Sequence, residues 1–229
     1  LKSAAETLKP CGLELGGKSA VIVFADADMA EATRRGLAGA ISANGQGCVN
    51  GTRLLVERPI YDQYVATLAA TAPHIKVGDP FDKTTIVGPV ISEASLTRIL
   101  GIVDTAKKEG GRVVAGGERL GGELADGYFL PLTLVADVKQ ESNIAQHEVF
   151  GPVLAITPFD DEDEAIAFAN GTEYGLGGYI HTQNLRRGHY VASQLDAGMI
   201  HVNGSGEGMT PCAPFGGVKQ SGYGRLGGE

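Results

Sequence analysis

Hydrophobic residues along this chain follow two alternating patterns: short β-branched runs, and longer stretches with apolar residues three or four positions apart. The short runs predict strands and the longer stretches predict helices. Strands are expected at residues 19–24, 52–57, 112–115, 128–135, 153–159, 175–181 and 199–203. Helices are expected from Asp26 or Asp28 to about residue 42, from Pro59 through residue 68, and over residues 92–109, 162–170 and 184–195. Such alternation is typical of a largely parallel sheet covered on both faces, so we predict a three-layer α/β sandwich.

The bulk composition narrows the choice of partners. The 229 residues are 43% hydrophobic and 20% charged, which is typical of a globular protein with one large domain or two small ones. A formal net charge of −8 argues against nucleic acid or an anionic membrane as the main partner. No apolar run approaches the ~18 residues of a membrane span. The first ten residues also lack a signal-peptide core.

The cysteines and the first residue add two further expectations. Cys11, Cys48 and Cys212 are widely spaced and form no CxxC pair, which suits a reducing compartment. We therefore expect a cytoplasmic protein that acts on a small molecule. The chain does not begin with Met, so we expect it to be a piece of a longer one.

Residues 12–19 match the phosphate-loop pattern GxxxxGK[ST] letter for letter. That motif needs a strand before it and a helix after it, so that helix N–H groups point at the phosphates. Here residues 5–9 are not strand-like, and residues 20–24 form an apolar β-branched run. We therefore predict no nucleotide phosphate site at this loop. The acidic cluster at residues 160–164 is likewise interpreted as the first turn of a helix, and no metal ligands are predicted.

Two residues carry candidate chemistry. Glu14 lies between two leucines and ahead of two glycines, where a carboxylate is either a paired structural charge or an acid/base whose pKa burial raises. Taken alone, the structural interpretation is favoured. Cys48 ends the turn Asn-Gly-Gln-Gly-Cys, whereas inert buried cysteines normally lie in apolar helices or strands. Its position therefore favours a reactive thiol.

The two segments together resemble a known family. LELGGKS (residues 13–19) and GQGC (residues 45–48), with 33 residues between Glu14 and Cys48, resemble the two active-site signatures of the aldehyde dehydrogenase superfamily. The resemblance continues through HEVFGP (residues 147–152), NGTEYGL (residues 170–176) and PFGGVKQSG (residues 214–222). It covers essentially the whole chain in the family's order, which makes the combination specific although GQGC alone is weak.

The resemblance implies a role for each matching residue. Cys48 is similar to the nucleophile that forms a thiohemiacetal and then a thioester, with its own backbone N–H contributing to the oxyanion site. Glu14 is similar to the base that activates water against the thioester. Three residues resemble those around the cofactor, NAD or NADP: Glu148 at the nicotinamide ribose hydroxyls, Phe150 beside the nicotinamide, and Leu15 through its carbonyl at the carboxamide. A carboxylate at Glu14 implies hydrolysis to a carboxylic acid, because relatives that pass the acyl group to coenzyme A generally lack it.

The resemblance also implies what lies elsewhere. Family members are about twice this long, and their other parts hold most of the dinucleotide fold, the Asn of the oxyanion hole and the segment that pairs across the dimer. Residues 1–229 are therefore expected to be the catalytic domain, without the cofactor-binding half and the C-terminal oligomerisation segment. We expect a homodimer or homotetramer at full length, an incomplete cofactor site here, and little or no dehydrogenase activity from the isolated domain.

Alternatives of other classes stay open. One is a cysteine-dependent hydrolase or esterase that pairs Cys48 with a histidine, and five are available: His74, His147, His181, His189 and His201. Another is a catalytically silent binding relative on the same scaffold. The loop at residues 204–213 matches the family's substrate tunnel; its three glycines and lack of aromatic residues predict either a wide, mobile tunnel or a flexible surface loop. Cys212 in that loop is interpreted as incidental.

Overall fold

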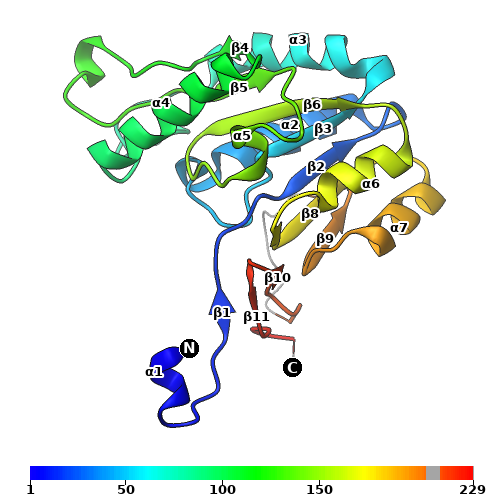
Figure 1. Cartoon of the computed structure of the whole chain (residues 1–229). Coiled ribbons are helices and arrows are strands. Elements are labelled where there is room, and N and C mark those ends of the chain that lie inside the picture. The colour runs from blue at the N-terminus through cyan, green and yellow to red at the C-terminus, as the bar shows by residue number, and fades with distance from the viewer. Residues whose placement is uncertain (205–211, 229) are drawn as a thin grey trace.

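A seven-stranded sheet forms the centre of the computed structural model, which describes residues 1–204 and 212–228 (Figure 1). The strand order is β4-β5-β6-β3-β2-β8-β9, and every neighbouring pair is parallel except β4 and β5. The strands of this sheet are β2 (Ala20–Val23), β3 (Arg53–Glu57), β4 (Arg112–Ala115), β5 (Thr133–Ala136), β6 (Val153–Phe159), β8 (Gly177–His181) and β9 (Met199–Val202). The predicted largely parallel sheet is confirmed.

Helices cover both faces of the sheet (Figure 1). One face carries α2 (Met29–Ile41) and α3 (Tyr61–Thr71); the other carries α4 (Glu93–Lys108), α5 (Asn143–Gln146), α6 (Glu162–Asn170) and α7 (Leu185–Gln194). Side chains alternate along β2, so that Val21 and Val23 pack toward α2 while Ala20 and Ile22 pack toward α6 and α7. The predicted three-layer α/β sandwich is therefore confirmed.

Side-chain caps fix where the helices begin. Asp28 caps α2 by accepting from the N–H of Glu31 at 3.1 Å, whereas Asp26 accepts from the hydroxyl of Thr182 at 2.7 Å. Of the two predicted caps, Asp28 is the right one. Asp161 caps α6 in the same way, so the acidic cluster forms the first turn of that helix as predicted.

Several predicted boundaries are wrong. The strand predicted from residue 128 begins only at Thr133, because Pro131 has no N–H to donate to a neighbouring strand. The helix predicted from Pro59 begins as a 3-10 turn over Arg58–Ile60, and α3 starts at Tyr61. The strand predicted from residue 175 is interrupted after β7 (Tyr174–Gly175), which leaves the sheet to pair with β10 (Val218–Lys219).

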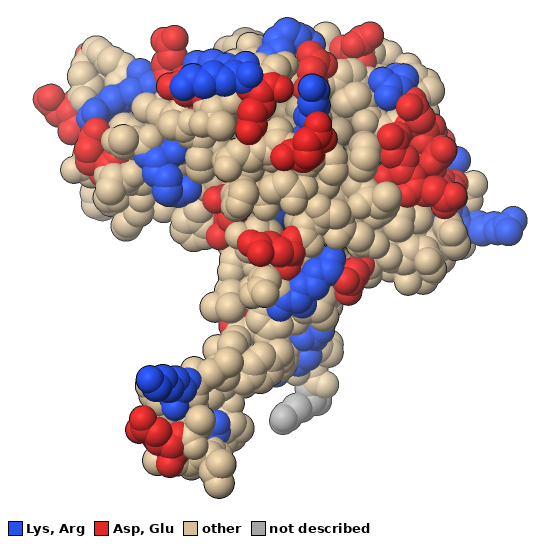
Figure 2. All heavy atoms as spheres, viewed as in Figure 1, with Lys and Arg blue, Asp and Glu red and all other residues tan. Residues whose placement is uncertain are grey.

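An N-terminal arm stands clear of the body (Figures 1 and 2). It consists of the short helix α1 (Lys2–Ala5) and β1 (Leu13–Glu14), which pairs antiparallel with β11 (Gly222–Tyr223). The arm then enters β2, so a strand and no helix follows the Gly-Gly-Lys-Ser segment, as predicted. None of the helices in the described part of the chain combines the length and apolar character needed to span a bilayer.

Candidate active site

The order of the strands brings the predicted site residues together. Gly17 lies just before β2, Cys48 lies in the turn before β3, and Glu148 lies in the segment before β6. Because β2, β3 and β6 are adjacent and parallel, these segments meet at one edge of the sheet, at the amino ends of the strands. Glu14 reaches the same edge on β1.

Two glycines allow the chain to pass closely between Cys48 and Glu148. A methyl group on Gly17 would lie 2.3 Å from the carbonyl oxygen of Cys48, and one on Gly16 would lie 2.5 Å from Oε2 of Glu148. The N–H of Gly17 donates to Oε1 of Glu148 at 3.0 Å. The Gly-Gly pair of the apparent phosphate loop is therefore needed for close packing within the site.

Amide side chains hold the turn that carries Cys48. Gly45 has a φ of +73° and lies so close to Gly151 that a methyl group there would be 2.1 Å from its carbonyl carbon. Oδ1 of Asn44 accepts from the N–H of Gly88 at 2.7 Å, and Oε1 of Gln46 accepts from that of Ile91 at 3.1 Å. The Asn-Gly-Gln-Gly sequence thus ties the turn to the segment ahead of α4.

The Cys48 thiol is half-buried and lies among acidic groups. Burial raises the pKa of Cys48 above its ordinary value of 9.0; the carboxylates of Glu148 and Glu14 raise it further, and the backbone N–H groups of Cys48 and Val49 act in the opposite direction. The resting side chain is therefore a neutral thiol near neutral pH. Two backbone donors nevertheless point at the sulfur, where a developing negative charge would form.

Glu14 presents a free acceptor to the same region. Its Oε2 is buried and accepts no hydrogen bond within residues 1–204 and 212–228. Oε1 lies 3.0 Å from the position that a methyl group on Gly216 would occupy. The arm is held in place beside it, because the N–H of Leu15 donates to the carbonyl of Ser221 at 3.1 Å. A carboxylate oxygen without a donor is suited to accept a proton.

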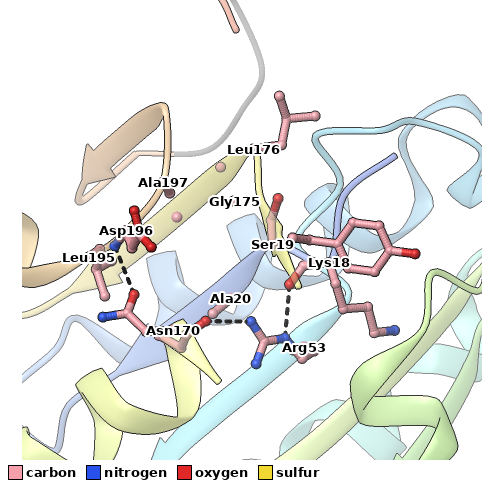
Figure 3. Close-up of a pocket in the computed structure, with 14 residues that line it drawn as sticks. Lys18, Ser19, Ala20, Arg53, Asn170, Gly175, Leu176, Leu195, Asp196 and Ala197 are labelled. Carbon is pink, nitrogen blue, oxygen red and sulfur yellow. Dashed lines mark hydrogen bonds between the residues drawn. The ribbon is translucent and has the colours of Figure 1, made fainter. Parts of the chain in front are cut away.

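Two buried cations lie behind the site and were not assigned a role from the sequence (Figure 3). Arg53 is 3% exposed and donates to the carbonyls of Lys18, Phe168 and Ala169 at 2.8, 2.6 and 2.7 Å. Lys18 is 1% exposed, and its Nζ makes no hydrogen bond to the described residues. Burial lowers the pKa of Lys18 to about 7, Arg53 lowers it further, and Glu148 raises it. Both cations line a cavity of about 10 Å³, which is room for about one water.

The other predicted residues lie at the surface of this edge. Phe150 is 37% exposed at a φ of +50°, so its ring is presented outward. Leu15 is 48% exposed and lines a groove of about 530 Å³ together with Tyr223 and other residues of the C-terminal segment. Of the predicted tunnel loop, residues 205–211 lie outside the described residues, and Cys212 is exposed.

No histidine partners Cys48 in the described part of the chain. Among the hydrogen bonds there, none joins a histidine to the thiol, and His147 bonds to Asn143. His181 ends β8 at the opposite edge of the sheet, where burial lowers its pKa to about 4. His201 stacks on Tyr179, with ring centroids 5.3 Å apart. The arrangement therefore offers carboxylates, and not an imidazole, to the sulfur.

Comparison with known proteins gives, along the whole chain, the same family that the sequence motifs resemble. The model of the aldehyde dehydrogenase family matches residues 1–229. A betaine aldehyde dehydrogenase from Cereibacter sphaeroides is 43% identical over 228 residues, which are 99% of this chain and 46% of that protein. This chain therefore spans about half the length of that relative.

Solved structures agree at the level of the fold. The NAD+ complex of an aldehyde dehydrogenase from Bacillus cereus superposes with a TM-score of 0.94 at 40% identity, over 99% of this chain and 45% of that one. A betaine aldehyde dehydrogenase from Staphylococcus aureus in complex with NAD+ gives a TM-score of 0.95 at 38% identity, with the same two shares.

Proposed function

The chain belongs to the aldehyde dehydrogenase family, and on that premise we propose that it carries the nucleophile and the hydrolytic base of an enzyme that oxidises an aldehyde to a carboxylic acid with NAD or NADP. One observation carries the proposal. Cys48, Glu14 and Glu148 come from separate segments and meet at the amino edge of the sheet, and both carboxylates act on the pKa of the thiol. Neither a structural charge nor an incidental cysteine accounts for that convergence.

In the proposed first step, the Cys48 sulfur attacks the carbonyl carbon of the aldehyde and forms a thiohemiacetal. The thiol begins neutral, so its proton must leave as the C–S bond forms; we assign the proton to Glu14, whose Oε2 has no donor in the described residues. We assign to the N–H of Cys48 the stabilisation of the carbonyl oxygen as it gains charge. A bound oxidised nicotinamide would supply the hydride acceptor, and Cys48 would then hold the acyl group as a thioester.

Glu14 acts again in the second step. Glu14 first passes the proton that it took from the thiol to solvent. Its carboxylate then removes a proton from water, the resulting hydroxide attacks the thioester carbon, and the C–S bond breaks as the proton on Glu14 passes to the sulfur. The carboxylic acid leaves and Cys48 returns to its starting state. We therefore assign hydrolysis, and not acyl transfer to coenzyme A, to this chain.

The residues present fit a share of the nicotinamide half of the cofactor. Glu148 uses one oxygen for Gly17 and leaves Oε2 without a hydrogen bond in the described residues, so an acceptor is available for ribose hydroxyls. Phe150 offers an exposed ring for the flat face of a nicotinamide. We assign the carboxamide to the carbonyl of Leu15, next to the base. The solved relatives with NAD+ support the choice of cofactor class.

The remaining parts of the proposal concern the whole enzyme. We take residues 1–229 to be the catalytic domain of a homodimer or homotetramer, with a small aldehyde as substrate. The free thiols of Cys11, Cys48 and Cys212 support a reducing cytoplasm as its location. Because the relatives are about twice as long, we expect these 229 residues alone to reduce NAD with aldehydes slowly or not at all. Sustained growth in the absorbance of the reduced cofactor would contradict this expectation.

An aryl ester tests the nucleophile and the base without a cofactor. With p-nitrophenyl acetate we expect a burst of about one p-nitrophenolate per chain, followed by slow turnover. Cys48→Ser should remove the burst. Glu14→Gln should keep the burst amplitude but slow the burst, because the thiol proton loses its acceptor, and should slow the turnover by roughly 10²-fold or more. Cys212→Ser, at an exposed thiol, is the matched control and should change neither. Acetylation of Cys11 or Cys212 ahead of Cys48, seen by peptide mass spectrometry, would contradict the assignment.

A further inference from the structure

Tyr179, which falls in a strand predicted from the sequence, lies against the turn that carries Cys48. Accepting Cys48 as the nucleophile of the proposed function, we propose that Tyr179 is a positioning residue: its hydroxyl fixes the carbonyl of Val49 and thereby keeps the N–H groups of Val49 and Cys48 directed at the sulfur. No helix or strand contains these two residues. A turn spans them, in which the N–H of Asn50 donates to the carbonyl of Gly47 at 3.1 Å, and this bond leaves the carbonyl of Val49 to be held by another donor.

One hydrogen bond makes the connection. The hydroxyl of Tyr179 donates to the carbonyl of Val49 at 2.7 Å. The N–H of the same residue lies at the Cys48 sulfur and lowers the pKa of the thiol. Tyr179 thus holds the carbonyl of Val49, while the N–H of Val49 acts on the Cys48 sulfur. Holding the carbonyl restricts rotation about the backbone of Val49 and with it the direction of the N–H.

The tyrosine is itself a rigid support. It lies in the middle of β8, is 5% exposed, and pairs with Val21 of β2. Its ring stacks on His201 of β9, with centroids 5.3 Å apart and 18° between the planes. On the other side, a methyl group on Gly51 would come within 3.3 Å of the ring. The hydroxyl therefore has little freedom to move away from Val49.

Tyr179 also remains a donor throughout the working pH range. Burial raises the pKa of Tyr179 to about 12, and the nearby Cys48 raises it further, so the phenol keeps its proton when the thiol loses its own. A purely structural role is the competing explanation, since a buried phenol normally needs an acceptor of some kind. The two explanations differ in what they predict for the reactivity of Cys48.

The experiment compares Tyr179→Phe with Tyr64→Phe in the 229-residue protein. Tyr64 is also fully buried, lies in α3, and its hydroxyl has no hydrogen bond in the described residues. The rate of alkylation of Cys48 by iodoacetamide is measured across pH by peptide mass spectrometry, with Cys11 and Cys212 as internal references. We expect Tyr179→Phe to move the profile to higher pH and to slow the reaction near neutral pH roughly two- to tenfold. Tyr64→Phe should leave the profile unchanged.

The outcomes separate this proposal from the one on which it rests. If the unmodified protein shows no burst with the ester, or if the burst survives Cys48→Ser, the proposed function fails. If Cys48 reacts as expected and Tyr179→Phe has the unmodified profile, Tyr179 is only structural and the positioning role is overturned. Should Tyr179→Phe not fold, His201→Ala removes the ring that supports Tyr179; an unchanged Cys48 profile in that variant overturns the role as well.

Discussion

Replacing Lys18 with Met should stabilise the folded protein near neutral pH. The Lys18 side chain is 1% exposed and its Nζ makes no hydrogen bond to residues 1–204 or 212–228. Burial is the main reason that its pKa falls from 10.5 to about 7, with Arg53 acting in the same direction and Glu148 against it. Met fills a similar volume and carries neither a charge nor a donor that needs a partner.

The sign and size follow from proton linkage. Between pH 7 and pH 10.5 the unfolded chain holds the Lys18 proton while the folded chain tends to release it, so this residue makes stability rise with pH. At or below pH 7 the folded state bears the full cost of holding a charged Lys18 in the interior. The pKa difference from 10.5 to about 7 makes that cost about 4–5 kcal/mol at 1.36 kcal/mol per pH unit. The advantage of Lys18→Met should therefore shrink by roughly 3 kcal/mol between pH 7 and pH 10.

Urea unfolding at several pH values measures this difference. The free energy of unfolding of each protein is extrapolated from the transition, and the variant is compared with the parent at the same pH, so that other titrating groups cancel. Lys83→Met, at an exposed lysine without a recorded hydrogen bond in the described residues, is the matched control and should show no trend. An advantage that stays constant with pH, or a variant less stable than the parent at pH 7, would refute the reasoning.

Of four further predictions, two concern the site, one a helix cap and one the core. Gly17→Ala would place a methyl group 2.3 Å from the carbonyl oxygen of Cys48. We expect it to slow alkylation of Cys48 at least tenfold and to lower the free energy of unfolding, measured in urea, by about 1–3 kcal/mol. A variant with the parental rate and stability would contradict the close packing. In the unmodified protein, alkylation of Cys48 should still be accelerating above pH 9, where a cysteine in a short peptide levels off, since burial raises the pKa of the thiol; an earlier plateau would count against this. Asp28→Ala should lower stability by about 1 kcal/mol through the lost α2 cap, and Leu134→Ala by about 2–5 kcal/mol through a core cavity, neither changing the ester burst.

The sequence was informative wherever a segment is decided by its own pattern. β2 and β6 have continuous apolar runs, and α4 has a stripe that begins at a serine cap, so each was predicted closely. The pairing of β1 with β11 joins two-residue segments that lie more than two hundred positions apart, and neither has a periodic pattern of its own. Pro131 was a readable signal for the late start of β5, because proline is rarely tolerated inside a sheet.

In the candidate site, a residue could be singled out from the sequence when its type is rare in its local setting, and not when it looks like an ordinary member of a strand. Cys48 was noticeable because a thiol in a glycine-rich turn is unusual. Glu14 stood out only through the resemblance of its segment and its spacing to the family's signatures, since its own neighbours favour a structural charge. Tyr179 and Arg53 look like ordinary members of strands, and only the fold shows what their polar ends reach. Lys18 did carry a signal, namely a charged residue directly before a fully apolar run, where unpaired burial is costly.

The position of the site at the amino edge of the sheet explains its electrostatics. In open parallel sheets, ligands usually bind beyond the carboxyl ends of the strands, where the following helices point their positive N-termini. At the amino edge α2 presents its C-terminus and ends before the turn that carries Cys48, whereas α4 begins just after Ile91, whose N–H donates to Gln46 of that turn. Two carboxylates raise the pKa of the thiol there and so oppose the formation of a thiolate. On the proposed mechanism, the charge that develops on attack is met by backbone N–H groups of the turn, and the side chains of Asn44, Gln46 and Tyr179 hold that turn by hydrogen bonds.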